Sequence, residues 1–377
     1  MRGEGHQPHA GATVAPAVQP AIHLFEPSGY AGVFQHACRV GQLLERRGLR
    51  VVLHTGHEHE EVDAAGVELC PCSWWPRTGA RGPRRSAEIA ARLSTRTLPH
   101  LHRASRGAVL HLQGIAAGGA LNLLTLGLQR LGNRRVVYSP HDTFSRRGRL
   151  DGALLGLALR LPDAVIVHSD ADVARLRKRG IEAHHSPLVQ IVPQPSEAAR
   201  TRWRREWGAS ADTPVVLFAG CIRPEKRLDL LIESARSWPP ERRLAVVGED
   251  RGAWERCASL AERHGVEMAA RVEFVSLDEF VAAIAAANVL VMPHERASQS
   301  GVLALACHLG TPTVAAGVGG LGELSSRTFP PGDVRALTRA IDDQLAAGGG
   351  AQPPLDEELA VDTHLRAYGI AGSLDGQ

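Results

Sequence analysis

Two basic side chains, Arg223 and Lys226, follow the apolar run PVVLFAG (214–220), which is typical of a buried strand. In open parallel sheets, binding groups collect at the carboxyl ends of the strands. Two cations at such a place suit a diphosphate whose negative charge grows as it leaves. An R-x-x-K pair alone is usually surface charge. Its position after a strand, and a second pattern in the same half of the chain, favour a functional role.

The second pattern is an apolar strand, a polar loop and a helix within VLVMPHERASQSGVLALA (289–306). Small residues at the start of a helix let backbone N–H groups approach an anion, which the helix dipole also favours. We therefore predict a phosphate site here. The residues that would form it are Ser298, Gln299, Ser300, Gly301 and Val302. The glycine-rich stretch 319–323 predicts a second flexible loop at the same edge of the sheet.

Elements that could hold these loops alternate along the whole chain. Strand-like apolar runs occur at 21–25, 50–55, 108–112, 135–139, 163–168, 214–220, 244–248, 272–275, 289–292 and 313–316, with helical segments between them. This alternation predicts an α/β protein with two doubly wound Rossmann-like domains facing across a cleft. A proline-bearing stretch, 184–197, marks the hinge. The expected parts are a disordered head (1–20), domains at 21–190 and 191–345, and a tail (346–377) whose helix packs at the interdomain junction.

Composition restricts the class of protein further. The chain has 377 residues, enough for two domains, and a formal net charge of only +3, which gives no argument for a nucleic-acid partner. No apolar run approaches the roughly 20 residues that span a bilayer, and residues 1–20 lack a signal-peptide core. We expect a cytoplasmic protein with reduced thiols.

The first half offers fewer polar groups at predicted strand ends. His141 and Asp142 follow one strand, and a loop with Gly29, Tyr30 and Gly32 follows the first. The loop lacks the G-x-G-x-x-G spacing of dinucleotide folds, which argues against NAD.

Two short motifs resemble metal ligands. The pair Cys70 and Cys72 has C-x-C spacing without a second half, and Asp170 and Asp172 form a D-x-D that helix capping explains more simply. We therefore predict no metal site.

The segment from Arg77 to Arg106 holds eight arginines against one acid, Glu88, with a helix expected over 86–98. It could be a solvated arginine-rich face, or it could contact anionic lipid or a phosphate-bearing acceptor on the inner membrane face.

Several motifs together resemble the retaining family-4 glycosyltransferases of the GT-B fold. They are GCIRPEKRLDLLI (220–232), LAVVGED (244–250), VEFVSLDEF (272–280), VLVMP (289–293), SQSGVLALA (298–306), GTPTVA (310–315) and VGGLGE (318–323), preceded by a glycine loop (29–33), VVYSPHDT (136–143) and DAVIVHS (163–169). The resemblance covers roughly residues 20–340.

The resemblance implies transfer of a sugar from a nucleotide-diphosphate donor, such as a UDP- or GDP-sugar, to an acceptor hydroxyl with retention of configuration, without a metal or other cofactor. Arg223 and Lys226 would neutralise the diphosphate, and His141 would lie near the transferred sugar. Tyr30 and Asp142 would be on the acceptor side. The acceptor would be a saccharide, a lipid-linked saccharide or a small molecule. Donor contacts would come from Gly29, Gly32, Gly220, Ser298, Gln299, Ser300, Gly301, Val302 and Glu323.

The chain departs from this family at two positions. Many members carry glutamates where Ala297 and Leu305 stand, the first near the donor sugar and the second on the ribose. Neither side chain can accept a hydrogen bond. A non-catalytic protein that binds a sugar nucleotide or glycan is therefore the alternative. A phosphorylase or an epimerase on a related fold is less favoured, because no lysine stands in a motif that would hold a cofactor.

Overall fold

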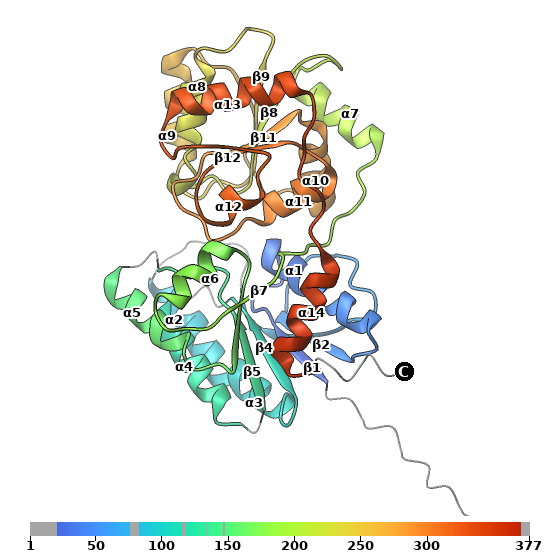
Figure 1. Cartoon of the computed structure of the whole chain (residues 1–377), viewed down its shortest axis with the longest axis vertical. Coiled ribbons are helices and arrows are strands. Elements are labelled where there is room, and N and C mark those ends of the chain that lie inside the picture. The colour runs from blue at the N-terminus through green and yellow to red at the C-terminus, as the bar shows by residue number, and fades with distance from the viewer. Residues whose placement is uncertain (1–20, 76–82, 115–117, 133, 146–147, 371–377) are drawn as a thin grey trace, which may run out of the picture.

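The computed structural model describes residues 21–75, 83–114, 118–132, 134–145 and 148–370. They form two domains, one above the other, each a parallel sheet between helices (Figure 1). The predicted disordered head, and the part of the arginine-rich segment at 76–82, lie outside the described residues.

The first domain has a seven-stranded sheet in the order β3-β2-β1-β4-β5-β6-β7, and its paired strands are parallel. Its central strands are buried along their length, because helices cover both faces of the sheet. The strands are β1 (Ile22–Phe25), β2 (Val51–Gly56), β3 (Glu68–Ser73), β4 (Val109–Gln113), β5 (Arg135–Ser139), β6 (Ala164–Val167) and β7 (His184–His185). The helices are α1 (Ala31–Arg46), α2 (Pro83–Arg92), α3 (Leu98–Ala104), α4 (Gly119–Arg130), α5 (Arg149–Ala158) and α6 (Asp170–Arg177), with a π-helical turn (Leu93–Thr97) between α2 and α3.

The second domain has a six-stranded sheet in the order β10-β9-β8-β11-β12-β13. One apolar core lies on each of its faces. The strands are β8 (Val215–Ala219), β9 (Arg243–Val247), β10 (Met268–Arg271), β11 (Val289–Met292), β12 (Thr313–Ala316) and β13 (Arg327–Phe329). The helices are α7 (Glu197–Glu206), α8 (Leu228–Ala235), α9 (Trp254–His264), α10 (Leu277–Ala286), α11 (Gly301–Leu309), α12 (Gly319–Leu324) and α13 (Val334–Ala347), and a 3-10 turn (Pro224–Lys226) follows β8.

Two sequence predictions about single elements are wrong, and strand β3 was missed. The stretch from Gly319 is the helix α12 and not a flexible loop. Strand β10 covers Met268–Arg271, ahead of the predicted run at 272–275, because MAAR pairs in register with β9. Strand β3 was not predicted, since its sequence ELCPCS has neither an apolar run nor clear alternation.

The C-terminal helix α14 (Glu357–Tyr368) belongs to the first domain. Its side chains Ala360, Val361 and Leu365 are buried in the same core as strands β1 and β2. Glu357 forms an ion pair with Arg39 of α1, with 2.6 Å between Oε2 and Nη2. The chain thus returns from the second domain and adds a helix to the core of the first (Figure 1). From the sequence, this helix was predicted to pack at the interdomain junction.

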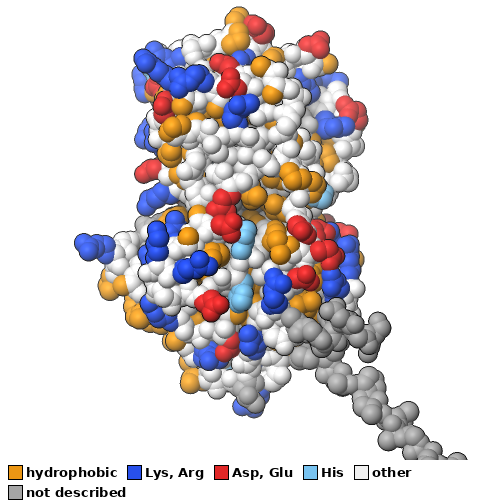
Figure 2. All heavy atoms as spheres, in the orientation of Figure 1, with side chains coloured by type: hydrophobic (Ala, Val, Ile, Leu, Met, Phe, Trp, Pro, Cys, Tyr) orange, Lys and Arg blue, Asp and Glu red, His pale blue; other side chains and the backbone are white. Residues whose placement is uncertain are grey.

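Positive and negative side chains are interspersed over the face shown in Figure 2, in keeping with the small net charge. Among the described residues, no helix is both long and apolar enough to cross a membrane.

Candidate functional site

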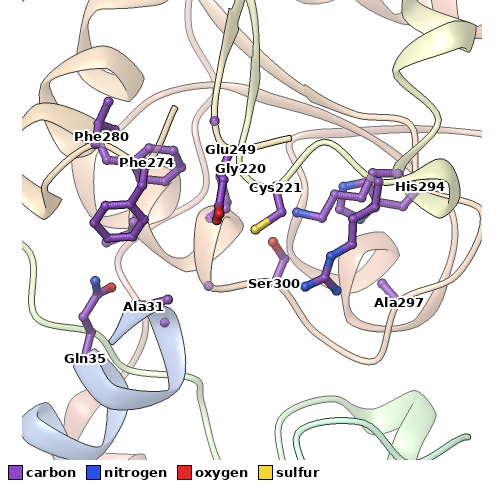
Figure 3. Close-up of a pocket in the computed structure, with 18 of the residues that line it drawn as sticks. Ala31, Gln35, Gly220, Cys221, Glu249, Phe274, Phe280, His294, Ala297 and Ser300 are labelled. Atoms are coloured by element: carbon purple, nitrogen blue, oxygen red, sulfur yellow. The ribbon is translucent and has the colours of Figure 1, made fainter. Parts of the chain in front are cut away.

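A pocket of about 290 Å³ lies where the two domains meet. Most of its wall comes from loops at the carboxyl ends of second-domain strands, and helix α1 of the first domain contributes Ala31, Gly32 and Gln35 (Figure 3). Parallel sheets place their loops at one edge, so residues far apart in sequence converge here. The pocket is thus located where the sequence predicted a cleft.

Both predicted cations line this pocket. Arg223 and Lys226 belong to the turn after β8, and a Cβ added at Gly220 would lie 3.0 Å from the Lys226 Nζ. Gly220 has φ +106°, so a side chain there would be strained and would also press on the ammonium group. The Arg223 guanidinium lies 3.9 Å from the Glu225 carboxylate, which leaves it available to a second anion. Both cations thus line the pocket, and their binding of a diphosphate stays a prediction.

The first turn of α11 faces the same space. Ser300 is its N-cap residue, and its Oγ accepts a hydrogen bond from the Leu303 N–H at 3.3 Å. The N–H groups of Gly301 and Val302 lie in the first turn, where they have no intrahelical acceptor. A Cβ added at Gly220 would also lie 3.4 Å from Val302, so the helix start and the Lys226 ammonium are close neighbours. A helix start beside an ammonium group is the arrangement expected of a phosphate site, and phosphate binding here stays a prediction.

Helix α1 begins opposite α11, but a carboxylate of the protein, that of Glu60, already lies at its N-terminus. Glu60 accepts hydrogen bonds from the Ala31 N–H at 3.0 Å and from the Gln35 side chain at 2.9 Å. Gly32 lies very close to α11: a Cβ added at Gly301 would be 3.7 Å from the Cα of Gly32. The α11 end, with its two cations, is consequently the more favourable place for a ligand phosphate.

The other end of the pocket is aromatic. Phe274 and Phe280 lie there, on the far side of Gly220 from His294 and Ala297 (Figure 3), and Phe274 is 44% exposed. An exposed aromatic ring at a pocket mouth can stack on a flat heterocycle. In the sequence, VEFVSLDEF (272–280) stood out only as one of the motifs that resemble a known family. The exposure of Phe274 in the fold is what identifies this position.

Further predicted residues do not line the pocket. His141 is 9% exposed, has φ +55°, and places its Nε2 2.9 Å from the Gln113 Oε1. Burial, together with the neighbouring imidazoles of His168 and His111, holds the pKa of His141 well below its usual range. It is therefore neutral at physiological pH, able to hydrogen-bond a hydroxyl but not to act as a cation.

Two predicted donor ligands instead hold the domains together. Ser298 is buried and its Oγ accepts a hydrogen bond from the Thr143 N–H at 3.2 Å. The Glu323 carboxylate accepts hydrogen bonds from the N–H groups of Asp170 at 2.9 Å and Ala171 at 2.8 Å, and so caps α6 of the other domain. Both side chains are near the cleft but outside the pocket wall.

The residues of the first glycine loop have mainly structural contacts. Gly29 has φ +76°, and a Cβ there would lie 2.6 Å from the Glu58 carbonyl oxygen. Tyr30 is the N-cap residue of α1. Glu26 accepts the Gly29 N–H at 2.7 Å, and burial raises its pKa to about 7. Gly29, Tyr30 and Asp142 are not in the pocket wall, whereas Gly32 is.

Ala297 and Leu305 lie in the pocket wall, where they are 8% and 2% exposed. The wall nevertheless contains acids on other elements, namely Glu60, Glu225, Glu249 and Glu273. Glu249 stands beside Gly220 near the centre of the pocket (Figure 3). The carboxylate near the centre of the pocket thus comes from the end of β9 and not from α11.

Groups of metal-ligating side chains also occur among the described residues. His36, His141 and His168 bring three buried ring nitrogens within 4.8 Å of one another, and His54, Cys70, Cys72 and His100 form a second group. The D-x-D pair belongs to neither group. Ser169, the residue before this pair, is the N-cap of α6 and accepts the Asp172 N–H, whereas the Asp172 carboxylate pairs with Arg175; both aspartates lie in the first turn of the helix.

Arg92 of the arginine-rich segment has partners on the protein itself. Arg92 pairs with Glu88 at 2.8 Å and lies over the Trp74 ring, 3.9 Å from its centroid. Exposed leucines occur on the neighbouring helices α4 and α5 and directly after α4. They are Leu124, Leu128, Leu131, Leu150 and Leu157.

Comparisons with known proteins agree with this architecture. Residues 30–193 match the family model described as Glycosyltransferase Family 4, and residues 213–347 match Glycosyl transferases group 1. The chain is 37% identical over 234 residues to D-inositol 3-phosphate glycosyltransferase of Xylanimonas cellulosilytica, covering 56% of this chain and 53% of that protein. It is 32% identical over 251 residues to 2-deoxystreptamine N-acetyl-D-glucosaminyltransferase of Streptomyces fradiae, covering 60% and 57%. The chain thus spans about half the length of the curated relatives it matches.

Solved structures extend the likeness over nearly the whole chain. Sucrose-phosphate synthase of Thermosynechococcus elongatus has a TM-score of 0.70 at 18% identity, with 94% of this chain and 95% of that chain covered. Anabaena HepE in complex with UDP-glucose has a TM-score of 0.67 at 17% identity, with 95% and 100% covered. The predicted fold is confirmed: two Rossmann-like parallel sheets arranged as in GT-B glycosyltransferases. The family models, one on each domain, support a family-4-type glycosyltransferase.

Proposed function

We propose that the protein transfers a sugar from a nucleotide-diphosphate donor to an acceptor hydroxyl. One observation carries the proposal: Arg223, Lys226 and the first turn of α11 line one pocket at the boundary between the two domains. The departing diphosphate gains negative charge in the transition state, and fixed cations and N–H dipoles stabilise that charge best when they are already in place. The matches to glycosyltransferase families support the same activity.

The donor would lie along the pocket, with its diphosphate at α11 and its base at the aromatic end. Phe274 would stack on the base, and Glu249, near the centre, would accept a hydrogen bond from a ribose or sugar hydroxyl. A UDP-sugar is the donor to test first, because HepE was solved with UDP-glucose and has the same fold. No metal or other cofactor is needed for this arrangement, in which the protein supplies the positive charge.

The acceptor would enter from the first domain and attack the anomeric carbon from the leaving-group face, which retains the configuration. Arg223 and Lys226 would stabilise the leaving group, and the neutral His141 would hydrogen-bond a sugar hydroxyl once the donor is bound. The names of the relatives, D-inositol 3-phosphate glycosyltransferase and 2-deoxystreptamine N-acetyl-D-glucosaminyltransferase, favour a small-molecule acceptor over a polysaccharide.

A non-catalytic sugar-nucleotide-binding protein is the second candidate, and the buried Ala297 and Leu305 favour it. One experiment separates the two. The protein is first screened against UDP, GDP and ADP by thermal shift, and the sugar nucleotides of the stabilising base are then incubated with inositol phosphate, an aminocyclitol or no acceptor. Transfer or slow donor hydrolysis supports the enzyme. A thermal shift without any turnover supports the binding protein, and the absence of both contradicts the donor site itself.

A further inference from the structure

We propose that the first domain binds one Zn²⁺ through His54, Cys70, Cys72 and His100. The four side chains bring their ligating atoms within 4.8 Å of one another. The Cys70 Sγ lies 3.6 Å from the His100 Nε2, and the Cys72 Sγ lies 4.0 Å from the His54 Nδ1. A tetrahedral zinc with two sulfurs and two nitrogens separates its ligand atoms by about 3.4–3.8 Å, given its bond lengths. The observed spacing is therefore close to that of a site ready to take the ion.

The ligands also have the right chemistry. Two thiolates and two imidazoles form the tetrahedral donor set that proteins use for structural zinc. Such a set balances the two positive charges of the ion. The group of three histidines near the cleft has no anionic ligand, so it competes less well for zinc. Four protein ligands also leave no open position, which indicates a structural ion and not a catalytic one.

A second hydrogen-bond shell supports the assignment. With its Nδ1 on the metal, His54 must carry its proton on Nε2, and this atom lies 2.9 Å from the Nδ1 of His23. Zinc-bound histidines regularly donate their other N–H in this way, which fixes the ring and its tautomer. His23 is 8% exposed and His54 is 2% exposed, so neither ring is free to reorient.

The position of the site explains what the ion would do. Strand β3 is the edge of the sheet, and Pro71 at its middle removes one ladder donor. His54 of β2 is the register partner of Cys70, and His100 comes from α3, directly beyond the π-helical turn. The ion would thus join a weak edge strand to its neighbour and to a helix 28 residues further along the chain, counted from Cys72 to His100.

Metal content of the full-length protein, purified with a thiol reductant and without a polyhistidine tag, tests the proposal. We expect one zinc per chain by mass spectrometry after dialysis. Cobalt added to the metal-free protein should give the visible absorption of tetrahedral Co²⁺ with a sulfur-to-metal charge-transfer band. The double variant Cys70→Ser, Cys72→Ser and the single variant His100→Ala should each lose the zinc and the cobalt spectrum. The control His102→Ala, on the same helix, should keep both.

Cobalt spectroscopy on the wild-type protein does not depend on whether any variant folds. A wild-type protein that binds zinc at much less than one per chain and gives no tetrahedral cobalt spectrum overturns the proposal. So does a Cys70–Cys72 disulfide in the reductant-treated protein, or equal zinc loss in the His102 control. Since the readout is metal content, the result is independent of whether the protein transfers sugar.

Discussion

Replacing Lys226 with alanine tests the proposed role of the cation pair most directly. The Lys226 Nζ would lie 3.0 Å from a Cβ on Gly220, and Val302 at the start of α11 would lie 3.4 Å from the same point. A phosphate held there would be about 4 Å from the ammonium charge, where the attraction is about 4 kcal/mol in a partly exposed site. A single well-placed donor is worth about 3 kcal/mol in the transition state. We therefore expect kcat/KM for donor turnover to fall roughly 150-fold.

The assay measures release of nucleoside diphosphate from the stabilising sugar nucleotide, with and without acceptor. The matched control is Lys178→Ala, because Lys178 is the only other lysine in the chain and is exposed at the end of α6. Control and wild type should have the same rate, and all three proteins the same Tm without ligand. If Lys226→Ala kept both the wild-type rate and the wild-type affinity for the diphosphate, the assignment of this pocket to the donor would be wrong.

Three further perturbations have defined outcomes. Phe274→Ala should raise the Kd for the nucleoside diphosphate roughly tenfold in calorimetry, because stacking on a base is worth about 1–3 kcal/mol, and an unchanged Kd would place the base elsewhere. Acidification from about pH 7 to about pH 5 should lower Tm. Burial holds the pKa of His364 at about 4 and that of His111 well below its usual range, so the unfolded chain binds protons first. His364 alone lowers the free energy of unfolding by about 2 kcal/mol at pH 5. Glu26 has the opposite effect, because its raised pKa favours the folded state as pH falls, but His364 and His111 together outweigh it. A Tm that rises on acidification would contradict this balance. Finally, if the arginine-rich side of the first domain contacts membranes, sedimentation with phosphatidylserine vesicles should fall in a Leu131→Ser, Leu150→Ser variant, whereas a wild-type protein that stays in the supernatant would argue against contact.

Most of the sheet could be predicted from the sequence because parallel strands buried on both faces are apolar throughout. The runs at 214–220 and 289–292 gave β8 and β11 almost to the residue. Strand β3 escaped prediction for the opposite reason. It lies at an edge, is only partly buried, and contains Cys-Pro-Cys where an apolar run would stand. Local pattern does not identify a strand that is held mainly by one neighbour.

The same strand shows what spacing alone could not reveal about the cysteines. C-x-C lacked a second half in the sequence because the other residues of the proposed zinc site are not a local motif. His54 comes from the neighbouring strand, and His100 comes from a helix beyond a π-helical turn. Histidine in a strand or helix has many structural uses, so neither residue indicated a ligand before the fold brought it to Cys70 and Cys72.

The sequence indicated which charged residues lie at the candidate donor site, but not which of the neighbouring side chains face the pocket and which contact the other domain. Arg223, Lys226 and the start of α11 face the pocket because each follows directly from a strand end of the same sheet. Ser298 and Glu323 follow from strand ends too, yet they bind backbone N–H groups of the first domain. The loops at these sheet edges form both the wall of the pocket and the contact between domains. A sequence motif identifies such a loop, but only the position of the opposite domain decides which of its side chains remain available to a ligand.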